Sequence, residues 1–153
     1  MSNVRPHGTV IPVLAHGLEC GTMDRSIPHI VIAEREFLIA LDAEYLIKSA
    51  LDCNVTLLRP EQLDEWDATA LAGIDLCLLD VPLDATRITA RINRLIEARV
   101  PLLFTTVADI HARGVENFEI VPIARKPYDG EALTKLVRGR LRQTPQPQET
   151  DQN

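Results

Sequence analysis

The stretch HIVIAEREFLIALDAEYLI, residues 29–47, indicates the fold class of this chain. Its apolar run Ile30–Ala33 is unbroken, as in a strand that is buried on both faces. Three charged residues, Glu34, Arg35 and Glu36, end the run, and a helical pattern begins directly after them. A buried strand that passes at once into a helix is typical of a βα unit.

The same alternation continues along the chain. Further apolar runs occur at Val55–Leu58, Ile74–Leu79, Leu102–Phe104 and Ile120–Ile123. The helical stripes between and after them are Ile39, Ala43, Leu46, Ile47 and Ala50, then Leu63, Trp66, Ala70 and Leu71, then Ile88, Ile92, Leu95 and Ile96, and finally Leu133, Leu136, Val137 and Leu141. Asp129 is placed to cap the last helix, whereas residues 107–118 are a weak helix candidate because Gly114 interrupts them. Five βα units predict a parallel sheet with helices on both faces.

Composition limits the domain count and the location of the protein. A length of 153 residues corresponds to one domain, which we place at residues 28–142. Residues 1–27 are expected to be a poorly ordered extension or to pack on the domain, and the polar, proline-containing tail 143–153 is expected to be disordered. No apolar run approaches the roughly 20 residues of a membrane span, so we expect a cytoplasmic protein.

Charge and single residue types exclude some functions. The net charge of −6 argues against binding to nucleic acid or to an anionic membrane. The three cysteines, Cys20, Cys53 and Cys77, form no metal motif and are expected to be buried thiols in a reducing compartment. Trp66 is expected in the core. No chemistry is assigned to the histidines, which are expected at the surface: His7, His16, His29 and His111.

Polar residues stand at the ends of several predicted strands. Glu34 and Arg35 follow the first strand, Asp80 ends the third, Thr105 and Thr106 end the fourth, and Arg125 and Lys126 end the fifth. In a parallel α/β sheet the functional site lies outside the carboxyl ends of the strands. A carboxylate, a hydroxyl and an ammonium that converge there suit an anionic group, with the Asp as nucleophile or metal ligand.

From about Pro28 to Leu141 the sequence resembles the receiver domain of bacterial two-component response regulators. Residues 29–47 resemble its first strand, acidic loop and first helix, and DLCLLDVPL (75–83) resembles its phospho-acceptor strand and loop. VPLLFTT (100–106) is similar to the strand that carries the switch hydroxyl, and ARKPYDGEAL (124–133) to its Lys-Pro motif, whose peptide bond is typically cis. The resemblance implies a flavodoxin-like, CheY-like fold with strand order 2-1-3-4-5.

The resemblance also implies a mechanism without catalytic turnover by this chain. A histidine kinase or histidine phosphotransfer protein would supply a phosphoryl group, and Asp80 would accept it in a phosphorelay. Lys126 would pair with the phosphoryl group, and Thr106 would donate a hydrogen bond to it. A magnesium ion would be held by Glu34, by Asp80 and by the backbone carbonyl of Pro82.

Two positions depart from the family pattern. Arg35 stands where the second acidic residue is usual, and a unit charge pair about 5 Å apart at a dielectric near 20 is worth about 3 kcal/mol. Magnesium binding at millimolar affinity supplies only about 4 kcal/mol, so Arg35 is expected to weaken it badly. We expect Arg35 to pair with Asp80 or Glu34 and partly to replace the metal. Ile123 stands where many receivers carry a switch aromatic, so aromatic rotation in its usual form is not expected.

Three functions remain open at this point. The first is a stand-alone receiver that is phosphorylated on Asp80 and signals by docking to other proteins. The second is a degenerate receiver that does not bind magnesium or phosphate normally and acts as a constitutive interaction module, with a homodimer possible. The third, an unrelated flavodoxin-like enzyme, ranks last because AERE (33–36) is no glycine-rich phosphate loop and Pro82 replaces the second acid of a D-x-D motif.

Overall fold

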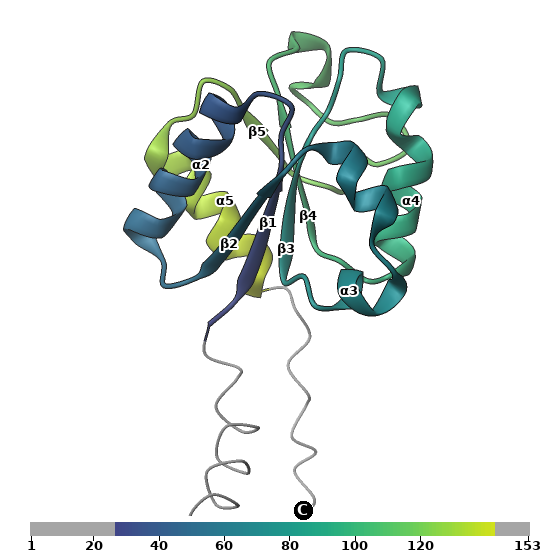
Figure 1. Cartoon of the computed structure of the whole chain (residues 1–153). Coiled ribbons are helices and arrows are strands. Elements are labelled where there is room, and N and C mark those ends of the chain that lie inside the picture. The colour runs from purple at the N-terminus through teal and green to yellow at the C-terminus, as the bar shows by residue number, and fades with distance from the viewer. Residues whose placement is uncertain (1–26, 143–153) are drawn as a thin grey trace, which may run out of the picture.

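The computed structural model describes residues 27–142 of the chain. Its centre is an all-parallel sheet in the order β2-β1-β3-β4-β5 (Figure 1). The strands are β1 (His29–Ala33), β2 (Asn54–Leu58), β3 (Leu76–Asp80), β4 (Leu102–Thr106) and β5 (Ile123–Arg125). This order confirms the flavodoxin-like fold class.

Helices cover both faces of the sheet. Helices α2 (Phe37–Ala50) and α5 (Gly130–Arg142) lie on one face, and α3 (Ala68–Ala72) and α4 (Thr89–Glu97) lie on the other (Figure 1). Alternate strand residues face opposite sides: Ile30 and Ile32 of β1 belong to the core under α2 and α5, whereas Val31 belongs to the core under α4. Both layers are therefore filled by unbroken apolar strands, as the sequence pattern predicted. Between residues 27 and 142, no helix is long and apolar enough to cross a bilayer.

The prediction of one helix through Leu63 and Leu71 was wrong. A 3-10 helix (Pro60–Glu65) ends at extended Trp66, and α3 starts afresh after Asp67, whose carboxylate accepts the Ala70 N–H at 2.8 Å. An Asp at this point satisfies the free N–H groups of a new helix better than it continues an old one. Trp66 is half-buried against the core rather than within a helical stripe.

Other element boundaries also differ from the sequence pattern. The third stripe is divided between a 3-10 turn (Ala85–Ile88) and α4, and its last member, Ile96, is exposed. The fifth strand is Ile123–Arg125, because Ile120 is 91% exposed and precedes the sheet. The weak candidate at residues 107–118 forms only a 3-10 turn at Asp109–His111, and Gly114 adopts a φ of +139°, outside the helical region. Asp129 does cap α5 by accepting the Ala132 N–H at 2.8 Å.

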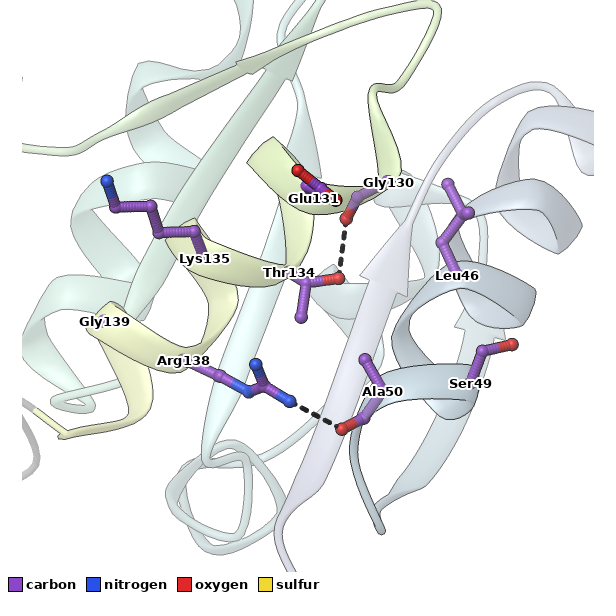
Figure 2. A pocket seen from close by; sticks show the side chains of 9 residues that line it. All are labelled: Leu46, Ser49, Ala50, Gly130, Glu131, Thr134, Lys135, Arg138 and Gly139. Atoms are coloured by element: carbon purple, nitrogen blue, oxygen red, sulfur yellow. Dashed lines mark hydrogen bonds between the residues drawn. The ribbon is translucent and has the colours of Figure 1, made fainter.

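A groove between α2 and α5 provides a first stability prediction. Figure 2 shows Gly139 of α5 at this groove of about 790 Å³, where an added Cβ would meet nothing within 4 Å. Gly139→Ala is therefore expected to raise the free energy of unfolding by about 0.5–1 kcal/mol through helix propensity alone. Urea denaturation measures the gain. Gly130→Ala is the control without a gain, because its Cβ would lie 3.1 Å from Leu46 Cδ2.

The buried thiols predicted from sequence are confirmed for Cys53 and Cys77, whereas Cys20 lies outside the described residues. Burial raises the pKa of Cys77 from 9.0 to about 12. Because the pKa of Cys77 is higher in the folded chain than in the unfolded chain, its contribution to the free energy of unfolding is fully present below pH 9.0. This contribution is lost as the pH rises toward 12. Because the thiolate is the nucleophile, we expect iodoacetamide to spare Cys77 in the folded protein and to label it in urea, as measured by peptide mass spectrometry. Equal labelling in both states would contradict the burial.

Candidate functional site

The carboxyl ends of the strands meet at the top of the view in Figure 1. Three of the predicted site residues are in contact at this end of the sheet. Lys126 Nζ donates to Asp80 Oδ1 at 2.8 Å and to Glu34 Oε2 at 2.9 Å. The three side chains are 5%, 2% and 3% exposed, respectively. Residues from the ends of β1, β3 and β5 thus form a buried ammonium–dicarboxylate cluster, and the Lys126–Pro127 peptide bond beside it is cis.

Arg35 completes the charge balance of this cluster. Its Nε donates to Asp80 Oδ2 at 2.7 Å, and this hydrogen bond is the main cause of the raised pKa of Arg35. The Arg35 side chain is 53% exposed, so it reaches the buried carboxylate from the solvent side. Two carboxylates are now matched by two cations, and both oxygens of Asp80 accept a charged donor. Of the two partners expected for Arg35, the structure selects Asp80.

The two threonines at the end of β4 have different neighbours. Thr106 is fully buried, and its Oγ1 accepts the Ala108 N–H at 3.0 Å. Thr105 is the residue paired with Asp80 in the sheet register. Burial raises the pKa of Tyr128, which packs against the core under α2 and α5. Thr105 is therefore the threonine that borders Asp80 in the sheet.

The ring of His111 contacts the Pro82 carbonyl, which is the third ligand expected for a metal. Its Nε2 lies 3.0 Å from the carbonyl oxygen of Pro82 and 3.1 Å from that of Leu83. Because a carbonyl only accepts, this nitrogen must carry the proton. His111 is buried, so its predicted surface position was wrong. His29 is half-buried at the start of β1, with Nε2 2.8 Å from Thr56 Oγ1, while His7 and His16 lie outside the described residues.

The donor set does not fit a magnesium ion as it is arranged. Glu34 offers one oxygen to Lys126 and the other to the Glu36 N–H at 3.2 Å, and both oxygens of Asp80 are engaged. The Pro82 carbonyl faces the ring of His111. Magnesium requires oxygen ligands in near-octahedral geometry at about 2.1 Å, which these donors obstruct. In the part of the chain that the structure describes, no group of three His, Cys, Asp or Glu residues is placed to hold a metal.

Two hollows differ in their relation to this site. The groove between α2 and α5 in Figure 2 is the larger, and it shares no lining residue with the cluster around Asp80. Within it, Arg138 Nη2 donates to the Ala50 carbonyl at the end of α2 at 2.9 Å, joining the two helices. A smaller, polar pocket of about 210 Å³ opens directly beside Asp80 and is lined in part by Arg35. The smaller hollow therefore adjoins the charged cluster, and the larger groove does not.

Comparison with known proteins shows the fold. No family profile matches the chain, and no curated protein matches it in sequence. The receiver domain of the PhyR response regulator of Erythrobacter litoralis is 22% identical with a TM-score of 0.63, covering 81% of this chain and 97% of that one. A response regulator receiver protein of Sinorhizobium medicae is 24% identical with a TM-score of 0.53, covering 76% and 96%.

A third solved structure comes from a protein of Burkholderia pseudomallei that is named as pilus assembly-related. It is 19% identical with a TM-score of 0.61, and the match covers 79% of this chain and 94% of that one. At these identities the likeness concerns architecture. The chain has the CheY-like receiver fold of response regulators, as the sequence resemblance predicted.

Proposed function

We propose that this chain is a receiver-fold signalling module that acts by docking to a cytoplasmic partner protein, with Asp80 neutralised by its own cations instead of by magnesium. One observation carries the proposal: Arg35 and Lys126 each donate to a different oxygen of Asp80. A phosphoryl donor must reach one of these oxygens, and each of them already accepts a charged donor. The same contacts stabilise Asp80 in the unphosphorylated state.

The surroundings of the site support a docking role. Phe37, Leu38 and Tyr45 of α2 are largely exposed, and Phe37 is two residues after Arg35 in the chain. Exposed apolar side chains that gather on one element are typical of protein interaction surfaces. The segment between β4 and β5 has a 3-10 turn in place of a helix, and Ile123 stands at the switch-aromatic position. These features favour a module that does not use the usual phosphorylation switch.

A second candidate is a receiver that takes phosphate on Asp80 without magnesium. Its support is the retained Lys126 contact at 2.8 Å, together with a second cation, Arg35, that is half-exposed and free to move with the incoming group. In this case a histidine kinase or phosphotransfer protein is the donor, and Arg35 supplies the charge that a metal normally supplies.

The experiment is intact-mass measurement after incubation with acetyl phosphate, with and without magnesium, beside an Asp80→Asn control. The docking module predicts no added phosphoryl group in either condition. A gain without magnesium that is absent in the control would select the second candidate. A gain that depends on magnesium would contradict both, because Arg35 would then have left Asp80 to make room for the ion.

A further inference from the structure

The pocket beside Asp80 gathers three arginines from three different elements. Arg35 comes from the β1–α2 loop, Arg87 from the 3-10 turn before α4, and Arg91 from α4 itself. Residues that are distant in sequence meet here only because the strands are parallel and their following loops lie at the same edge of the sheet. The lining also holds two carboxylates, Asp80 and Glu61, and Asp64 forms an ion pair with Arg91 from outside it.

Many guanidinium donors in this pocket have no partner within residues 27–142. Arg35 uses only Nε, on Asp80, which leaves both of its Nη groups. Arg91 binds Asp64 through Nε and Nη2 at 2.9 and 2.8 Å, which leaves Nη1. The exposed side chain of Arg87 makes no hydrogen bond or ion pair in the described range. Planar guanidinium groups with free donors match the oxygens of phosphate in geometry as well as in charge.

We propose that this pocket binds a phosphoryl dianion non-covalently, with Arg87 and Arg91 as its main ligands and the free Nη groups of Arg35 as the third. The volume of about 210 Å³ lies below the 300–1,000 Å³ of pockets that enclose drug-sized molecules. It therefore takes a phosphate ion, or the terminal phosphate of a larger compound that stays outside. The proposal rests on the proposed function in one respect. Arg35 contacts Asp80, so an anion bound to Arg35 also changes the surroundings of Asp80 in the docking module.

The test is titration of the full chain with inorganic phosphate, followed by the Nε–H resonances of its arginines at constant ionic strength. Saturable shifts are expected at Arg87, Arg91 and Arg35. Arg87→Ala is expected to weaken binding by about tenfold, equivalent to roughly 1.4 kcal/mol. Arg113→Ala, which removes the same charge from an exposed position elsewhere, is expected to leave binding unchanged. Thermal unfolding of both variants verifies that they are folded.

A parallel titration with glycerol phosphate separates the sources of the anion. Binding as tight as that of inorganic phosphate supports a ligand that carries its phosphate on a larger molecule, and weaker binding supports the free ion. No saturable shift at millimolar phosphate, or equal binding by Arg87→Ala and the native chain, would overturn the proposal. Magnesium-dependent phosphorylation of Asp80 would contradict the proposed docking function but not the phosphate pocket, because Arg87 and Arg91 do not contact Asp80 in the structure.

Discussion

Replacement of Lys126 by Met is expected to lower the free energy of unfolding by about 3–5 kcal/mol, the usual cost of leaving a buried charge without its partner. The Lys126 ammonium is the shared donor of Asp80 and Glu34, at 2.8 and 2.9 Å, and all three side chains are at least 95% buried. Without it, two carboxylates face each other and only the half-exposed Arg35 remains as a cation. Methionine keeps the unbranched stem of the side chain and is one atom shorter, so packing changes little.

Urea denaturation followed by fluorescence of Trp66, the single tryptophan, measures this loss. Lys135→Met on the exposed face of α5 is the matched control and is expected to change stability by less than about 0.5 kcal/mol. The slope of free energy against urea should be the same in all three proteins, so that midpoints compare directly. A loss below about 1 kcal/mol for Lys126→Met would mean that the cluster is solvated and weak.

Arg35→Asp is expected to strengthen magnesium binding at Glu34 and Asp80. The substitution removes the guanidinium from Asp80 Oδ2 and adds a third carboxylate beside Glu34 and Asp80. At about 5 Å and a dielectric near 20, each unit charge pair changes the binding free energy by about 3 kcal/mol, a factor of more than 100. Millimolar or tighter affinity is therefore expected in the variant.

Isothermal titration with magnesium measures the difference, with Arg113→Asp as a control that changes the net charge equally at an exposed position outside the pocket lining. Addition of His111→Ala to Arg35→Asp is expected to tighten binding further, because it releases the Pro82 carbonyl from the His111 ring. Equal magnesium affinity in the native chain and in Arg35→Asp would show that Arg35 does not obstruct the ion.

Much of the fold could be predicted because its physical causes lie within short stretches of sequence. Unbroken apolar runs such as Ile30–Ala33 and Leu76–Leu79 require burial on both faces, which in turn requires helices on both sides of a parallel sheet. The approach of Lys126 to Asp80 followed from the rule that strand ends meet at one edge, whereas the contact of Lys126 with Glu34 was not predicted. The cap of α5 by Asp129 was equally local.

The remaining features depend on tertiary contacts and on competing local interactions, which the periodicity of the sequence does not reveal. Leu63 and Leu71 fit one helical stripe, yet the Asp67 carboxylate between them accepts the Ala70 N–H and caps a new helix. His111 lies in a segment without periodicity, and its burial depends on two carbonyls that are distant in sequence. Whether Thr105 or Thr106 borders Asp80 depends on a register of one residue, which only the sheet pairing decides.

The most direct test of the account is a crystal structure of the native protein grown at high magnesium concentration. The account predicts that Arg35 Nε stays within hydrogen-bond distance of Asp80 Oδ2, that Lys126 bridges Asp80 and Glu34, and that His111 still faces the Pro82 carbonyl. A magnesium ion bound between Glu34, Asp80 and the Pro82 carbonyl, with Arg35 turned out to solvent, would contradict the claim that the chain neutralises Asp80 by its own cations.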